Sequence, residues 1–208
     1  MPHRLELLVA TRNKKKLKEI KEILAYMKLK ITSLADYKNM PCIVEDGRTF
    51  ARNAIIKAST IAQFTKKLVL GEDSGLQVKA LGNRPGVYSA RYSGAGATDK
   101  KNNLKLLKEL KNVPLKKRMA RYQCSVALVD QGGLVGVVSG QCDGVIGFRP
   151  KGRCGFGYDP VFVIEKYGKT FAELGPAVKH TMSHRYKALM KLRFLMGRYL
   201  KRSHRVSS

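Results

Sequence analysis

Acidic residues are scarce in this 208-residue chain, which has 15 Asp and Glu against 41 Lys and Arg and a formal net charge of +26. So large an excess predicts affinity for phosphate-bearing partners without saying which ones. A nucleic-acid binder, a protein that handles small polyanions and a generally basic surface all fit it. Much of the charge lies in residues 14–16, 100–121 and 198–205, and the last two stretches could be solvated helix faces.

Other absences exclude whole classes of protein. The chain has no Trp, and no apolar run approaches the roughly 20 residues that a membrane span needs. The first residues lack the long apolar region of a secretory signal. The four cysteines are widely spaced and form no C-x-x-C pair, so we expect reduced thiols and a cytoplasmic protein rather than a zinc site or a disulfide framework.

The length and the 44% hydrophobic content allow one sizeable core. We expect a single domain over residues 1–200 and a basic, frayed tail over residues 201–208. The order of strand-like and helix-like patterns predicts an α/β domain with a mixed sheet. The expected strands cover residues 5–9, 29–34, 68–70, 76–81, 120–129, 134–138, 141–146 and 161–164, and the expected helices cover residues 14–27, 49–64, 100–110 and 183–200.

The scarcity of acids draws attention to Glu72 and Asp73, which follow the apolar run 68–70. This pattern predicts a buried strand that ends in an acidic loop. Adjacent carboxylates repel each other and need a cation, for which a hard divalent metal is the obvious candidate. A solvated acidic turn is the alternative, and these residues alone would favour it. In so basic a chain, however, a carboxylate pair beside an apolar run is better explained by a function.

A strand, a short loop and a basic helix start the chain. The loop holds Thr11 and Asn13, either of which can cap the helix, and Lys16 lies in the first helical turn. Free N–H groups and the positive end of a helix dipole make such a loop a ready anion site. A basic, solvated helix start is an equal alternative. Further along, Asn53 and Lys57 are one helical turn apart and share a face.

Six short sequence blocks follow one another along the chain. No single block is specific, but their order is. They are residues 10–16; residues 45–50 with Asn53, Ala54, Lys57 and Ala58; residues 72–76; residues 85–92; residues 155–160; and Lys179 with residues 183–185. The series closely resembles the inosine triphosphate pyrophosphatase family and covers about Leu7 to Leu195. Two positions depart from the commonest family pattern: Glu72 stands where Asp is frequent, and Cys154 precedes Gly155 where Gly is frequent.

The resemblance implies an enzyme that hydrolyses ITP, dITP and XTP to the monophosphate and pyrophosphate with Mg²⁺, usually as a homodimer. It implies an elongated mixed sheet flanked by helices, in two lobes with the active site in the cleft between them. By resemblance, Asp73 activates the attacking water and Glu45, Glu72 and Asp73 hold the metal. Residues expected to bind the substrate are Thr11, Asn13, Lys16 and Lys57 for the phosphates, Phe156, Gly157, Tyr158, Asp159, Lys179, His184 and Arg185 for the base, and Ser74.

Elementary chemistry is consistent with those roles. Cleavage between the α- and β-phosphates moves negative charge onto pyrophosphate, which lysines and Mg²⁺ stabilise. Phe156 and Tyr158 offer flat faces for a purine, although both could be core aromatics. Donors such as His184 and Arg185 would donate to the 6-oxo group of hypoxanthine or xanthine and disfavour adenine. His184 could instead belong to a helix cap formed by Ser183.

Two rival functions remain. A nucleic-acid-binding protein would use residues 100–121 and the basic tail, but nucleic-acid binding needs none of the carboxylates. A pyrophosphatase with another modified-nucleotide preference keeps the same residues and changes only the base. We therefore expect a nucleoside triphosphate substrate and no membrane partner, with nucleic acid disfavoured.

Overall fold

The structure is a computed structural model that describes the backbone of residues 5–206 and the side chains of residues 5–201. The chain divides into two compact units. Unit 1 contains the segment up to Asp73, Cys124–Gly140 and the segment from Arg185, and unit 2 contains Ser74–Gln123 and Gln141–His184. Two noncontiguous units agree with the two lobes that the resemblance implies. The single-domain description of residues 1–200 stays a prediction.

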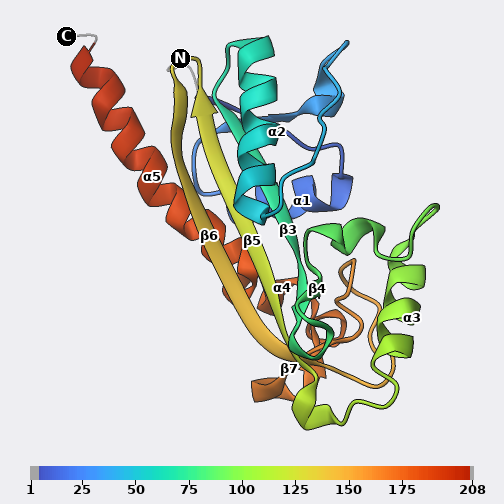
Figure 1. The fold of residues 1–208 in the computed structure, drawn as a ribbon. Helices are drawn as coiled ribbons and strands as arrows, with labels where there is room; N and C mark the ends of the chain where they lie inside the picture. Colours follow the sequence, from blue (N-terminus) through green and yellow to red (C-terminus); the bar gives the residue numbers. More distant parts are fainter. Residues whose placement is uncertain (1–4, 207–208) are drawn as a thin grey trace. The chain divides into compact units, whose positions relative to one another are not determined.

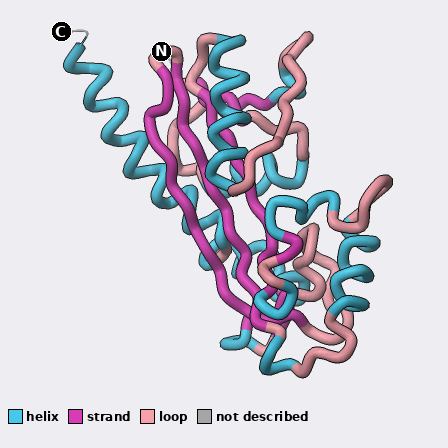
Figure 2. The backbone as a smooth tube through the Cα atoms, viewed as in Figure 1, coloured by secondary structure: helices cyan, strands magenta, loops and turns pink. Residues whose placement is uncertain are grey.

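The strands form the mixed sheet that the sequence predicts, with the order β2-β1-β3-β5-β6-β7-β8 and with β4 paired to β3. Strand β1 is parallel to β2 and β3, whereas β4 is antiparallel to β3, and β7 is antiparallel to β6 and β8. Strands β5 and β6 are the longest and run side by side (Figure 2). The bounds are β1 Glu6–Val9, β2 Lys30–Ser33, β3 Val69–Val78, β4 Arg84–Pro85, β5 Met119–Asp130, β6 Gly133–Ile146, β7 Phe162–Ile164 and β8 Lys169–Thr170.

Strand β1 is buried on both faces within unit 1. Alternation along β1 sends Leu7 and Val9 to one face and Leu8 and Ala10 to the other. The first face packs against α1 (Lys14–Ile23) and α5 (His184–Val206), whose apolar residues recur every three or four positions. The second face packs against α2 (Phe50–Thr65), which lies beside β3 (Figure 1). Helices on both faces account for the nearly continuous apolar sequence of β1.

Unit 2 has its own aromatic core. Leu76 of β3, Tyr122 of β5, Phe162 of β7 and Phe171 belong to one buried cluster. Helix α3 (Asp99–Glu109) begins after its cap Thr98, and α4 (Phe171–Met182) begins after Thr170, which forms a capping box with Glu173. Helix α4 is interrupted at Gly175, where φ is 75°, directly before Pro176.

Several expected boundaries were wrong. Strand β3 continues through Glu72, Asp73 and Ser74, so these residues are not in a loop. The reason is that buried cations pair with both carboxylates, which lets the strand continue through the core. The two strands expected over residues 134–138 and 141–146 are the single strand β6.

The helices also differ from expectation. Helix α1 ends at Ile23 rather than near residue 27, and α5 continues to Val206, well past residue 200. The rest of the expected tail, residues 207–208, lies outside the described residues. No helix is predicted over residues 171–182, and Gly175 and Pro176 in the middle of α4 interrupt a regular helical pattern.

Candidate active site

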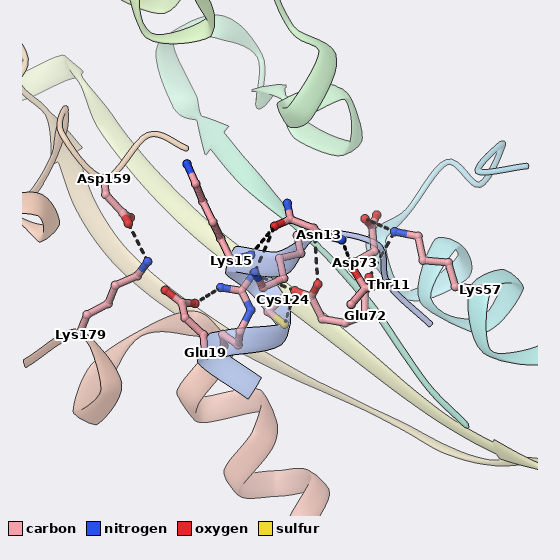
Figure 3. Close-up of polar contacts among 12 residues, drawn as sticks. Thr11, Asn13, Lys15, Glu19, Lys57, Glu72, Asp73, Cys124, Asp159 and Lys179 are labelled. Carbon is pink, nitrogen blue, oxygen red and sulfur yellow. Dashed lines mark hydrogen bonds and ion pairs between the residues drawn. The ribbon is translucent and has the colours of Figure 1, made fainter. Parts of the chain in front are cut away.

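Lys57 gathers two carboxylates from different segments of unit 1. Its Nζ lies 2.6 Å from Oε2 of Glu45 and 3.1 Å from Oδ1 of Asp73, and it also donates to the carbonyl oxygen of Glu72 at 3.2 Å. Lys57 and Asp73 are both buried, whereas Glu45 is partly exposed. Figure 3 shows the ammonium group of Lys57 directed at Asp73. Two of the three expected metal ligands thus meet around one positive charge.

Asn53 contacts the second carboxylate oxygen of Asp73. Its Nδ2 donates to Oδ2 of Asp73 at 3.1 Å, while its Oδ1 accepts from the backbone N–H of Gly47 at 2.8 Å. Asn53 therefore ties the segment that carries Glu45 to the strand that carries Asp73. The sequence placed Asn53 and Lys57 on one helix face, and the structure confirms it, but no function was expected of Asn53.

Helix α2 can reach β3 because Gly71 has no side chain. A Cβ at Gly71 would lie 2.1 Å from the carbonyl oxygen of Ala54 and 2.8 Å from the nitrogen of Ala58. Both atoms belong to the backbone of α2, so a larger residue would push the helix away. The close approach brings Asn53 and Lys57 within hydrogen-bonding distance of Asp73.

Burial and charge act on the ionisation of this cluster in opposite directions. Burial raises the pKa of Asp73 and outweighs the lowering effects of Lys57 and Lys16. Burial also disfavours the charged form of Lys57, but Asp73 and Glu45 outweigh it and raise the pKa of that amine. Lys57 therefore stays positive, while Asp73 takes up a proton more readily than an exposed aspartate.

Glu72 points to the opposite face of β3, as expected for neighbouring residues in a strand. It is 3% exposed. Its Oε1 accepts from Nη2 of Arg185 at 3.0 Å and from Sγ of Cys124 at 3.3 Å, and its Oε2 lies 2.9 Å from Nζ of Lys16 (Figure 3). Burial opposes the ionisation of Glu72, but the charges of Lys16 and Arg185 prevail and hold its pKa well below the usual range.

Arg185 lies in unit 1 and is 1% exposed. Its guanidinium group also pairs with Glu19 of α1, which fixes it between two carboxylates. Burial disfavours the charge of Arg185, yet Glu72 and Glu19 raise its pKa above the ordinary value. The structure thus places Arg185 with Glu72, and its expected role at the base stays a prediction.

The loop between β1 and α1 is ordered by its own polar side chains. Oδ1 of Asn13 accepts from the backbone N–H groups of Lys15 and Lys16 at 3.0 and 3.1 Å, so Asn13 caps α1. Oγ1 of Thr11 accepts from the N–H of Asn13 at 3.1 Å. The cap is confirmed as one of the two expected from the sequence. Substrate binding by Thr11 and Asn13 stays a prediction.

In unit 2, Asp159 and Lys179 form a buried ion pair. Nζ of Lys179 lies 2.6 Å from Oδ2 of Asp159 (Figure 3). The same oxygen accepts from the N–H of Phe156 at 2.9 Å. Nζ of Lys179 lies 4.7 Å from the ring centroid of Phe156, which is a cation–π distance. A Cβ at Gly155 would lie 2.1 Å from Oδ2 of Asp159, so the tight turn needs glycine there.

The next two residues of this turn are also held in place. The carbonyl oxygen of Gly157 accepts from Asn103 at 2.9 Å, and the hydroxyl of Tyr158 donates to the carbonyl oxygen of Ser89 at 2.8 Å. Tyr158 is 3% exposed and belongs to the core of unit 2. Its ring therefore has no free face for a purine, whereas Phe156 is only half-buried.

His184 lies at the start of α5, directly after Ser183, and is 3% exposed. Its imidazole stacks on the ring of Tyr122, with 4.5 Å between the ring centroids and an interplanar angle of 6°. Ser183 ends α4, and its N–H donates to the carbonyl oxygen of Lys179 at 2.9 Å. Ser74 follows Asp73 in β3 and is half-buried.

Asn103, Tyr122 and Glu19 contact expected site residues, but sequence reasoning did not identify them. Glu19 lies among the basic residues of α1, and its acidic character was the only available signal. Tyr122 reads as one position in an alternating strand, and nothing in its neighbours points to His184, which lies far along the chain.

Among the described residues, 5–206, no group of three or more His, Cys, Asp or Glu side chains is placed to hold a metal ion. Within the same range no helix is long and apolar enough to cross a membrane. All four cysteines are free thiols, as predicted, and Cys124 and Cys142 are buried.

Comparison with known proteins agrees with this geometry. The Ham1 family matches residues 7–195. The dITP/XTP pyrophosphatase of Geobacter sulfurreducens is 48% identical over 191 residues, which are 92% of this chain and 96% of that protein. The corresponding enzyme of Geobacillus kaustophilus is 46% identical over 187 residues, or 90% and 92% of the two chains.

Solved structures support the same relationship. A HAM1 protein from Coxiella burnetii superimposes with a TM-score of 0.84 at 37% identity, over 93% of this chain and 99% of that one. A dITP/XTP pyrophosphatase from Mycobacterium abscessus gives a TM-score of 0.74 at 40% identity, over 90% and 97%. The matched residues, 7–195, extend through both units and include every site residue described above, and this chain therefore belongs to the Ham1 family.

Proposed function

We propose that this protein hydrolyses deaminated purine nucleoside triphosphates (ITP, dITP and XTP) to the monophosphate and pyrophosphate. The observation that supports this most directly is the convergence of Glu45 and Asp73 on the ammonium group of Lys57. A buried base, a second carboxylate and a lysine are the groups that phosphoanhydride hydrolysis requires. The names of the relatives supply the substrate class.

Mg²⁺ fits the residues that are present. Glu45 and Asp73 already surround a position that holds a positive charge, and Mg²⁺ takes only one or two carboxylates together with phosphate oxygens. A bound Mg²⁺ would neutralise charge on the phosphates and make the attacking water more acidic. We assign Glu45 and Asp73 to the ion. Glu72 points to the other face of β3, where Arg185 and Lys16 already neutralise it.

The side chains of unit 1 have separate roles in this reaction. Asp73 accepts a proton from the attacking water, a role that suits a buried carboxylate with a raised pKa. Lys57 and Lys16 attract the triphosphate and stabilise the charge that develops on the departing pyrophosphate. The capped start of α1 keeps Lys16 in the first helical turn.

The side chains of unit 2 recognise the base. Phe156 provides the stacking face, because its ring is half-buried while that of Tyr158 lies in the core. His184 and the turn at residues 155–159 supply polar groups for the base edge. A hydrogen-bond donor facing position 6 would donate to the 6-oxo group of hypoxanthine or xanthine. Adenine has an amino group at this position and would leave that donor unpaired.

We further propose that the protein acts in the cytoplasm as a homodimer that removes deaminated nucleotides before they enter nucleic acids. Free thiols agree with a reducing compartment. Light scattering on a size-exclusion column tests the dimer, for which we expect twice the 23.2 kDa of one chain. Nucleic-acid binding as the main function is not favoured, because it would leave the buried acids and lysines without a purpose.

Pyrophosphate release from ITP, XTP, dGTP and ATP tests the proposal directly. Each reaction is run in parallel with Mg²⁺ and with a chelator. We expect metal-dependent release that strongly favours ITP and XTP. Release from another modified or pyrimidine triphosphate instead would keep the reaction and change the substrate. No release from any of them would overturn the proposal and make salt-dependent polynucleotide binding the next measurement.

A further inference from the structure

Tyr122 of β5 contacts two of the groups in unit 2 that we assign to the base, namely His184 and the turn at residues 155–159. Its ring stacks on the imidazole of His184, with 4.5 Å between the centroids and 6° between the planes. Its hydroxyl oxygen accepts from the backbone N–H of Tyr158 at 3.0 Å. Tyr122 is only 6% exposed, so it is not itself a surface for a ligand.

The ring of Tyr122 is fixed independently of any ligand. Its centroid lies 4.7 Å from that of the Phe162 ring and 6.3 Å from that of the Phe171 ring. The two phenylalanine rings stack on each other with 5.4 Å between their centroids. Both phenylalanines are buried in the core of unit 2. Tyr122 is therefore a rigid support, and a group that lies against it takes its orientation from the core.

The two contacts of Tyr122 act on different features. A nearly parallel stack restricts the plane of the His184 imidazole and hence the direction of its two ring nitrogens. The hydrogen bond fixes the peptide between Gly157 and Tyr158 on one side, while Asn103 fixes the carbonyl oxygen of Gly157. The turn that carries Phe156 and Asp159 is thus held by groups that come from α3 and β5.

We propose that Tyr122 is a positioning residue for base recognition, which sets the plane of His184 through its ring and the Gly157–Tyr158 peptide through its hydroxyl. This inference rests on the proposed function, since it assigns the cluster to the purine. It predicts that Tyr122 affects the affinity for the base and leaves the chemical step unchanged, because Asp73, Lys57 and Lys16 belong to unit 1.

The test uses the Tyr122→Phe variant, which retains the ring and loses only the hydroxyl. Tyr92→Phe is the matched control: Tyr92 is also buried in the core of unit 2, and its hydroxyl donates to Glu109 at 2.6 Å rather than bonding to the backbone of the base turn. Affinity is measured with inosine monophosphate, which carries the base without the triphosphate. We expect Tyr122→Phe to weaken this binding about three- to tenfold, as for the loss of one hydrogen bond, and Tyr92→Phe to stay within twofold.

Tyr122→Leu separates the two contacts. The ring-proton resonances of His184, assigned by their absence from His184→Asn, report on the stacked ring. The chemical shifts of these resonances should change in Tyr122→Leu and remain the same in Tyr122→Phe and Tyr92→Phe. In the hydrolysis of ITP, Tyr122→Phe should raise KM with kcat unchanged within twofold.

Inosine monophosphate binding equal to wild type in Tyr122→Phe, or equal losses in Tyr122→Phe and Tyr92→Phe, would overturn the proposal. So would unchanged His184 resonances in Tyr122→Leu, or a wild-type protein that does not bind inosine monophosphate. Failure of the proposed function is seen separately, as the absence of pyrophosphate release by the wild-type protein.

Discussion

Lys57 and Asp73 form a buried ion pair, with 3.1 Å between Nζ and Oδ1, and the same ammonium group pairs with Glu45 at 2.6 Å. A buried charge that loses its partner is costly, so each group keeps the others charged and in place. The ammonium group lies where a divalent cation would also be attracted. The pair therefore links the stability of unit 1 to the proposed metal site.

Replacing Asp73 with Asn should remove the proton acceptor while leaving the shape of the side chain. We expect kcat for ITP hydrolysis to fall by about 10²–10⁴-fold, the usual contribution of general-base catalysis. Circular dichroism should show an unchanged fold. Asp143→Asn is the control, because Asp143 is an exposed aspartate that pairs with Arg121, and it should keep full activity. A fully active Asp73→Asn protein would remove Asp73 from the mechanism.

Replacing Lys57 with Met should leave Glu45 and Asp73 facing each other without a cation. We expect a lower melting temperature in the absence of metal, because two carboxylates lose their partner. Mg²⁺ should then raise the melting temperature of Lys57→Met by more than that of the wild type, since only the variant lacks a cation at this position. An equal or smaller effect of Mg²⁺ on the variant would argue against a metal site at Glu45 and Asp73.

Glu45→Gln and Glu72→Gln should have different effects on metal affinity. Calorimetric titration should show weaker Mg²⁺ binding in Glu45→Gln and nearly unchanged binding in Glu72→Gln. Glu72→Gln should instead lower the melting temperature, because it leaves the buried Arg185 with Glu19 alone. Loss of Mg²⁺ binding in Glu72→Gln to the same degree would make Glu72 a third ligand, as the resemblance implies.

Glu6 predicts a pH-dependent contribution to stability. Hydrogen bonds from Tyr37 and Lys67 lower the pKa of Glu6 from 4.5 to about 2. A lowered pKa means that the stabilisation is fully present above pH 4.5 and is lost as the pH falls toward 2. Glu6→Gln should thus melt at a lower temperature than the wild type at pH 7, and the difference should shrink below pH 4.5. A difference that is constant from pH 7 to pH 3 would contradict this assignment.

Gly71→Ala should separate α2 from β3. A Cβ would lie 2.1 Å from the carbonyl oxygen of Ala54, so the helix must move. We expect a loss of about 3 kcal/mol in the free energy of unfolding, at the upper end for overpacking, and a decrease in activity because Lys57 moves with the helix. Gly132→Ala in the exposed β5–β6 turn, where the nearest atom lies at 3.4 Å, is the control and should be nearly neutral. Equal melting temperatures of the two variants would contradict the close approach.

The sequence predicted local features more reliably than distant contacts. The cap at Asn13 and the shared face of Asn53 and Lys57 follow from spacing within one helix, and both are confirmed. The family and the mixed sheet also follow from the order of the motifs. Each of these depends on residues close together in the chain or on the order of blocks.

Contacts between distant segments were beyond such reasoning. Glu72 and Asp73 were expected in a loop because nothing near them shows that Arg185 arrives from the far end of the chain. On the sequence alone Tyr158 could be a stacking face or a core aromatic, because Ser89, which its hydroxyl contacts, lies far away in the chain. Helix α4 was missed because Gly175 and Pro176 are local breakers, whereas its start is set by the Thr170 capping box.

The way the chain passes between the two units has a consequence for its synthesis. Of the segments of unit 1, β1 and α1 are synthesised first, Cys124–Gly140 of the β5–β6 hairpin later, and α5 last. Leu189, Leu192 and Met196 of α5 complete the same core that Leu7 and Val9 begin. On the ribosome, α1 can cover part of the apolar face of β1 early, but the face is covered completely only after α5 has emerged near the end of synthesis. Unit 1, which holds Asp73 and Lys57, cannot be obtained by truncating the chain, and a stop codon before α5 should leave aggregated protein rather than a smaller active enzyme.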